Sequence, residues 1–395
     1  MGNLAAAVQI TENHRPWRKA ESLLHASPAH TPHSPSPHST LVSITHCQLV
    51  FDHVLRSLYP CICACGETCT STISTRPYSL RCPSCLRQKS KLAHTPFVHL
   101  RIPQYMMGWL LEESFIRHPK PVTAAEIVKK LGVSEKTALL MKRRVQLLAS
   151  EQMEKIRFLI RDELYKAFPP DFKLPPEGED VTASIQNKPV VAMDTIALYS
   201  CSNRANQGRK RHKNRGATSS IYMSEKLGGR QIGTLAQVMG TQSGWCVAHS
   251  VPDQKAGTLG PLIRQWIPHN AAVFSDEMYT WLWGIYKNHR MVNHSLKSKD
   301  SRYRFSRERW SRKGVCSATA EALNNSLKTA FRNYTYVRPQ YSQMYLDEWC
   351  WWKNVKYFGL EKVKECGESM GSIKLRVLLL QHAPPRSRLR LRVCG

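Results

Sequence analysis

The cysteines between residues 61 and 85 constrain the fold of this chain more than any other feature. They lie in the tract PCICACGETCTSTISTRPYSLRCPSC, in which Cys82 and Cys85 form a CxxC pair and Cys65 precedes a glycine. Sixteen residues separate Cys65 from Cys82, a length that suits a small hairpin between two metal-binding knuckles. Four thiolates satisfy the tetrahedral coordination of Zn²⁺, so the tract predicts a zinc ribbon.

The cysteine that completes the first knuckle is ambiguous, because three residues separate Cys61 from Cys65 and one residue separates Cys63 from it. The longer spacing favours Cys61, so the expected zinc ligands are Cys61, Cys65, Cys82 and Cys85. The chain has thirteen cysteines, an odd number, and we detect no secretory signal, which favours metal binding over disulfides. A set of unrelated free cysteines is the alternative.

The charge balance indicates a polyanionic partner. The chain has 57 lysines and arginines against 29 aspartates and glutamates, a net charge of +28, and such an excess is typical of proteins that bind nucleic acid. A membrane surface is the other class of partner, but no apolar run approaches the ~18 residues of a spanning helix. We therefore expect nucleic acid as the partner and no membrane association.

A helix-turn-helix is predicted by the stretch PVTAAEIVKKLGVSEKTALLMKRRVQLLA. Thr123 is a candidate N-cap with Glu126 completing a capping box, and Gly132 permits the turn. Ser134 then caps a second helix. The alternative is an ordinary helical pair with a solvated basic face. The DNA contacts expected from the second helix are Lys136, Thr137, Lys142, Arg143 and Arg144.

Composition and pattern divide the chain into six segments. Residues 1–58 include the tract ASPAHTPHSPSPHST and are expected to be a low-complexity, disordered extension. The zinc ribbon is assigned to 59–98, the helical DNA-binding region to 99–165, a Pro- and acid-rich linker to 166–187, an α/β domain to 188–360 and a basic tail to 361–395.

From residue 188 onward, strands alternate with helices. PVVAMDTIALYS, QIGTLAQVMG and GWCVAHSV are predicted strands, the last two joined by a short turn at residues 241–243. The basic stretch RANQGRKRHKNRG after the first strand is expected to be a loop. DQKAGTLGPLIRQWI then suits a helix, NAAVFSDEMYTWLWGIYKNH a strand and a helix, RMVNHSL a strand and ATAEALNNSLK a helix. This order predicts a mixed α/β domain.

Three carboxylates are placed for metal chemistry. Asp194 lies within an apolar strand, Asp276 falls just past a strand, and Glu321 lies on the last helix. A buried carboxylate needs a partner, carboxylate oxygens suit Mg²⁺, and a two-metal site promotes attack on a phosphodiester. Lys328 follows Glu321 by seven residues and shares its helix face. For Glu321 alone, a solvent-exposed salt-bridge face is the alternative.

The chain resembles the DDE transposases of bacterial insertion sequences of the ISXO2 type, which join an N-terminal zinc ribbon to an RNase-H-like catalytic domain. The resemblance rests on CPSCLRQKS, VPDQKAGTLGPLI, FSDEMYTWLW, MVNHS, ATAEALNNSLK and YSQMYLDEWCWWKN, and covers about residues 60–357. It implies double-stranded DNA as the partner, with metal-dependent strand cleavage and strand transfer at terminal inverted repeats. It also implies a homo-oligomer on DNA, in the bacterial cytoplasm at the nucleoid.

The resemblance assigns roles to individual residues. Asp194, Asp276 and Glu321 are expected to bind Mg²⁺ or Mn²⁺, and Lys328 is expected to be the basic catalytic residue that accompanies them. A DNA or active-site contact is expected from His294, with a packed structural histidine as an equal alternative. Further phosphate contacts are expected from the basic stretch, at Arg209, Lys210, Arg211, Lys213 and Arg215.

The chain departs from the family pattern at three positions near these carboxylates. Thr195, Cys316 and Asn324 stand where the family usually has glutamate, histidine and an aromatic residue. A second hypothesis is therefore a zinc-dependent DNA-binding protein whose catalytic domain has decayed. A third, a nuclease or Holliday-type resolvase on the same fold, is disfavoured by the segment YLDEWCWWKN.

Overall fold

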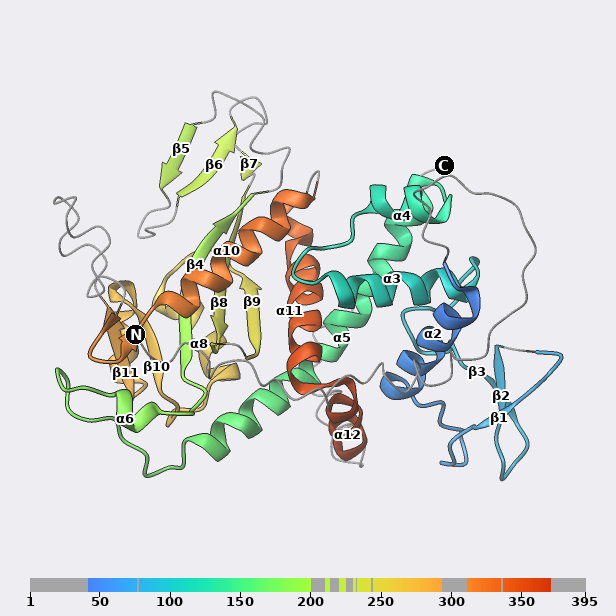
Figure 1. The fold of residues 1–395 in the computed structure, drawn as a ribbon, viewed down its shortest axis with the longest axis horizontal. Coiled ribbons are helices and arrows are strands. Elements are labelled where there is room, and N and C mark those ends of the chain that lie inside the picture. The colour runs from blue at the N-terminus through green and yellow to red at the C-terminus, as the bar shows by residue number, and fades with distance from the viewer. Residues whose placement is uncertain are drawn as a thin grey trace, which may run out of the picture.

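A mixed five-stranded sheet forms the centre of the C-terminal half of the chain (Figure 1). The structure, a computed structural model, describes residues 42–76, 78–199, 210–213, 220–224, 230–231, 233–242, 244–292, 311–334 and 337–370. The strands of the central sheet, in spatial order, are β11 (His289–Val292), β10 (Val273–Asp276), β4 (Val191–Leu198), β8 (Thr234–Gly240) and β9 (Cys246–Ser250). Strand β10 is parallel to β4 and β11, whereas β8 is antiparallel to β4 and β9.

Strands β4 and β8, in the interior of the sheet, are buried on both faces. Every residue of β8 is buried, and in β4 only Asp194 and Ala197 are partly exposed. Such strands need cover on each side of the sheet. Helix α10 (Ala318–Asn333) lies across β4 and β8 (Figure 1). The predicted mixed α/β class is confirmed, and the sheet is consistent with an RNase-H-like domain.

Several shorter elements complete this half of the chain. Helix α8 (Ala256–Trp266) packs against η2 (Glu277–Gly284). The sequence predicted an α-helix at the position of η2, which is a 3-10 helix. The predicted basic loop contains strand β5, which pairs with β6 in a separate three-stranded sheet. The remaining elements are β5 (Lys210–Lys213), β6 (Ser220–Ser224), β7 (Arg230–Gln231), α6 (Thr182–Ile185), β12 (Ser311–Arg312), β13 (Val315–Cys316) and η4 (Pro339–Tyr341).

The N-terminal half is helical except for the cysteine hairpins. Its elements are α2 (Ile44–Leu58), β1 (Ser71–Thr72), β2 (Ser79–Arg81), β3 (Gln88–Ser90), α3 (Gln104–Arg117), α4 (Ala124–Leu131) and α5 (Glu135–Ala167). Helices α2 and α3 approach so closely that a Cβ added to Gly108 would lie 1.8 Å from the carbonyl oxygen of Cys47. Glycine is therefore required at that crossing.

The helix boundaries predicted around the turn are confirmed. Thr123 and Glu126 form the capping box of α4, and Gly132 ends that helix with a positive φ of 67°. The side chain of Ser134 accepts from the Thr137 amide at the start of α5. Each signal is local, because a cap needs only the side chain and the amides of one turn.

Helix α5 is 33 residues long and joins the two halves of the molecule. Its partner is α11 (Ser342–Phe358), which Figure 1 shows between the sheet and the N-terminal helices. Lys142 of α5 forms a buried ion pair with Glu348 of α11, and the Ser150 hydroxyl donates to Asp347 over 2.7 Å.

Helix α11 also closes the edge of the central sheet. The Asn354 side-chain oxygen accepts from the Cys246 amide over 2.9 Å, and its nitrogen donates to the Cys246 carbonyl over 2.8 Å. Gln343 accepts from the Ser250 amide over 2.8 Å. These amides take the place of a neighbouring strand and satisfy backbone groups of β9 that an open edge would expose.

Two of the predicted segment boundaries are wrong. Residues 44–58, assigned to a disordered extension, form α2, whose Phe51 and Val54 are buried. Residues 361–370, assigned to a basic tail, belong to α12 (Leu360–Met370), which packs on α2 and α5 with Val363 fully buried. Both helices gain stability from residues far away in sequence, which a composition window does not reveal. Within the described ranges, no helix has the length and apolarity that crossing a membrane requires.

Candidate active site and metal centre

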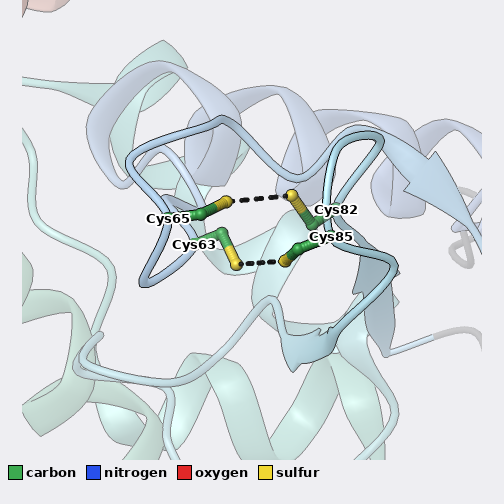
Figure 2. A group of neighbouring side chains, drawn as sticks. All are labelled: Cys63, Cys65, Cys82 and Cys85. Atoms are coloured by element: carbon green, nitrogen blue, oxygen red, sulfur yellow. Dashed lines mark hydrogen bonds between the residues drawn. The ribbon is translucent and has the colours of Figure 1, made fainter.

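Four cysteines converge between the two knuckles of the N-terminal hairpins. The sulfur atoms of Cys63 and Cys85 lie 3.3 Å apart, and those of Cys65 and Cys82 lie 3.5 Å apart (Figure 2). All four sulfurs are within 4.8 Å of one another. Gly66, with a φ of 91°, makes the turn that follows the first pair. Four thiols at this spacing fit a tetrahedral metal site.

One member of this set differs from the sequence expectation, because Cys63 takes the place assigned to Cys61. The segment pairs with itself across an isolated bridge between Ile62 and Thr68. In that pairing the Cys69 amide donates to the Cys61 carbonyl over 2.7 Å. Cys61 therefore lies beside Cys69, further from the turn. Cys63, which is one residue away from Cys65, is the cysteine that reaches the second knuckle.

Backbone amides favour the thiolate forms of two of these cysteines. The pKa of Cys63 is lowered, first by the amide of Cys65 and then by the thiol of Cys85. The pKa of Cys82 is lowered by the amide of Cys85. Thiolates are the form that binds zinc, and the cluster fits a zinc ribbon in its donor set, although the pKa values of Cys65 and Cys85 are raised.

The three predicted carboxylates come from adjacent elements of the second half. Asp194 is on β4, and Asp276 ends the neighbouring parallel strand β10. Glu321 lies in the first turn of α10, which crosses β4. Burial raises the pKa of Asp194 to about 7, and the negative charges of Asp276 and Glu321 contribute to that increase. The fold therefore brings Asp276 and Glu321 close enough for their charges to act on Asp194.

Asp194 is held at both carboxylate oxygens. Its Oδ1 accepts from the Thr195 amide over 2.7 Å, and its Oδ2 accepts from the Asn324 side chain over 2.7 Å. Asp276 accepts from the Met278 amide over 3.1 Å and thereby caps η2. Among the described residues, no lysine or arginine forms an ion pair with Asp194.

A buried polar network that the sequence analysis missed lies behind the carboxylates. The Tyr279 hydroxyl lies 2.6 Å from the Thr195 hydroxyl and donates to Gln237 over 2.7 Å. Burial raises the pKa of Tyr279, as does the charge of Asp194. The sequence marks Thr195 only as a departure from a family pattern. Its partners lie on β8 and η2, so nothing local in the sequence indicated the network.

The five residues of α5 that the sequence assigns to DNA contacts lie in different environments. Lys142 is buried in its ion pair with Glu348, so its assignment to a DNA contact is wrong for this structure. Arg143 stacks over the Tyr341 ring at 5.1 Å, and Arg144 donates to two backbone carbonyls of residues 96 and 98. Lys136 is exposed and Thr137 is partly exposed at the start of α5.

The other expected contacts are described less fully. Lys210, Arg211 and Lys213 lie on β5, of which the structure describes the backbone. Arg209, Arg215 and His294 lie outside the described residues. Lys328 is partly exposed on α10, nearly two turns after Glu321.

A mixed sheet that places two carboxylates on neighbouring parallel strands and a third on the covering helix is consistent with an RNase-H-like domain. Residues 199–354 match the family model of the ISXO2-like transposase domain. The resemblance to an ISXO2-type transposase is therefore confirmed for this segment. It includes Asp276, Glu321 and Lys328, and begins shortly after Asp194. Comparison with curated proteins found no match, and comparison with solved structures found none.

Proposed function

We propose that this protein is a DDE transposase that cleaves DNA at the ends of an insertion sequence and joins the cut strand to a target. The observation that carries the proposal is that buried Asp194 lies within electrostatic range of Asp276 and Glu321, in a segment whose greater part matches a transposase domain. DNA as the substrate agrees with the net charge of +28. We also propose that the protein acts in the cytoplasm, at the nucleoid.

The three carboxylates supply the ligands for divalent cations. Their oxygens are the hard donors that Mg²⁺ and Mn²⁺ prefer. A cation bound there activates the attacking oxygen and stabilises the leaving oxygen of a phosphodiester. The raised pKa of Asp194 agrees with this assignment, because burial and then the charges of Asp276 and Glu321 disfavour its carboxylate form until positive charge enters the site.

The chain's own residues orient this site. The Thr195 amide and the Asn324 side chain each occupy one oxygen of Asp194 and fix the plane of its carboxylate. The Met278 amide holds Asp276 at the end of β10. Lys328 supplies a positive charge on the same helix as Glu321, suited to a phosphate oxygen.

DNA binding is assigned to the basic and zinc-binding regions. We assign Zn²⁺ to Cys63, Cys65, Cys82 and Cys85, where it would fix the relative positions of the two knuckles.

Exposed Lys136 at the start of α5 remains our candidate for a contact from the helix-turn-helix. Phosphate contacts are assigned to Arg209, Lys210, Arg211, Lys213 and Arg215, and a DNA or active-site contact to His294. Synapsis of two element ends requires a homo-oligomer on DNA.

The decisive experiment is cleavage of a labelled duplex that carries the element's own end, with Mg²⁺. We expect the wild type to cut and Glu321→Gln to bind without cutting, because the substitution removes one cation ligand. Glu365→Gln, at an exposed position of α12, is the matched control and should cut like the wild type. Cutting by Glu321→Gln would contradict the triad. Tight binding without cutting by all three proteins would support the zinc-dependent DNA-binding protein instead.

A further inference from the structure

The side-chain amide of Asn324 is hydrogen-bonded to Asp194 of the carboxylate group. It lies on α10, one turn after Glu321, and is 3% exposed. Its Nδ2 donates to Oδ2 of Asp194 over 2.7 Å. Because the other oxygen of Asp194 accepts from the Thr195 amide, this bond removes the remaining rotational freedom of the carboxylate.

The other half of the Asn324 amide has no partner within the described part of the chain. Its Oδ1 is buried and no donor among these residues reaches it. Buried acceptors in native proteins are nearly always satisfied, so this oxygen, on a side chain bonded to Asp194, is available to a water molecule or an ion. Packing does not explain the residue either, because buried Leu323 and Leu327 on the same helix show that apolar side chains suit this interface.

We propose that Asn324 is a positioning residue for Asp194 and, through Oδ1, a neutral oxygen ligand of the divalent cation. The inference rests on the proposed function, since it takes Asp194, Asp276 and Glu321 as the cation site. An amide oxygen is a hard ligand that such cations accept. It adds no charge to a site where three carboxylates already repel one another, so it completes the coordination without increasing that repulsion.

Mn²⁺ binding to the full-length, zinc-loaded protein tests the proposal without any need for cleavage. Affinity is measured from the electron paramagnetic resonance signal of free Mn²⁺, an ion that thiolates bind poorly. Asn324→Leu should bind Mn²⁺ about tenfold or more weakly, the size of effect that supporting residues of metal sites produce. Asn324→Asp keeps an oxygen at the position and should bind within about threefold of the wild type or more tightly.

The matched control is Asn325→Leu, which makes the same change at the next, exposed position of α10 and should leave Mn²⁺ affinity unchanged. Unchanged affinity in Asn324→Leu would overturn the proposal. Should that variant fail to fold by circular dichroism, Asn324→Asp decides, because a tenfold loss there would overturn the ligand role.

Asp276→Asn separates failure of this inference from failure of the proposed function. If Asp276→Asn weakens Mn²⁺ binding while the Asn324 variants do not, the triad stands and only the role of Asn324 is wrong. If Asp276→Asn binds Mn²⁺ as tightly as the wild type, the carboxylates are not the cation site. Both proposals are then overturned.

Discussion

Lys142 of α5 and Glu348 of α11 form an ion pair in which the side chains are 5% and 4% exposed. Gln146 donates to the second carboxylate oxygen over 3.3 Å, and the Lys142 ammonium lies 5.8 Å from the centre of the Tyr334 ring. The pair joins the second helix of the predicted helix-turn-helix to the helix that closes the central sheet. A lysine expected at the DNA thus belongs to the junction between the two regions.

Loss of one partner of this pair should destabilise the protein strongly. Lys142→Met leaves the Glu348 carboxylate buried without its cation, which costs about 3–5 kcal/mol. The double variant Lys142→Met/Glu348→Met should recover much of that loss, because no uncompensated charge remains. Urea unfolding followed by tryptophan fluorescence measures both effects.

Lys136→Met is the control for this prediction, since Lys136 is exposed on the same helix. It should change stability by less than about 0.5 kcal/mol. Equal unfolding midpoints for Lys142→Met and Lys136→Met would show that the ion pair does not form in solution.

The zinc content of single cysteine variants should separate Cys63 from Cys61. Cys63→Ser removes one of four clustered thiols and should abolish tight zinc binding, whereas Cys61→Ser should retain one zinc per chain. Release of zinc to a colorimetric chelator after purification measures the stoichiometry. Zinc loss in Cys61→Ser with retention in Cys63→Ser would restore the ligand set that the sequence spacing favoured.

The sequence predicted what short-range chemistry determines. The caps at Thr123 and Ser134 and the turn at Gly132 need contacts within one helical turn, and the structure has all three. The order of strands and helices followed from apolar periodicity in the same way. The choice between Cys61 and Cys63 needed the turn geometry at Gly66, because spacing alone does not show how the segment folds back on itself.

What the sequence did not reveal depends on distant partners. Lys142 and Glu348 are 206 residues apart, and Asn324 and Asp194 are 130 residues apart. A basic residue in a basic stretch therefore resembles a DNA contact, and an asparagine at an aromatic position resembles a random departure. The charges of Asp276 and Glu321 act on Asp194, which agrees with the prediction that these three residues belong to one site. Their catalytic role remains a prediction.

The stability of the cation-free protein should fall as pH rises from about 4 to 8 because of Asp194. Its pKa is raised from 3.8 to about 7, mainly by burial. Between these values the native state holds a proton that the unfolded state has lost, so rising pH favours unfolding. Asp194→Asn removes this penalty. Its advantage over the wild type should be absent near pH 4 and largest above pH 7, with an upper limit of about 4 kcal/mol.

Urea unfolding at pH 4 and pH 8, without divalent cations, measures that difference. Asp180→Asn is a control of opposite sign, because hydrogen bonds from Thr182 lower the pKa of Asp180. That variant should be no more stable than the wild type at pH 8. An Asp194→Asn variant that differs equally from the wild type at both pH values would show that Asp194 titrates normally.

Asn354 should be essential to the edge of the central sheet. Its side chain satisfies both the amide and the carbonyl of Cys246 on β9. Asn354→Leu leaves these two buried groups without partners, at about 1–3 kcal/mol for each. The expected result is a lower urea midpoint and increased self-association at high protein concentration, because an unpaired edge strand is a template for another chain.

Asn333→Leu, at an exposed position near the end of α10, should change neither property. A midpoint for Asn354→Leu equal to that of Asn333→Leu would show that water or another residue satisfies β9, and that α11 is held by its apolar face alone.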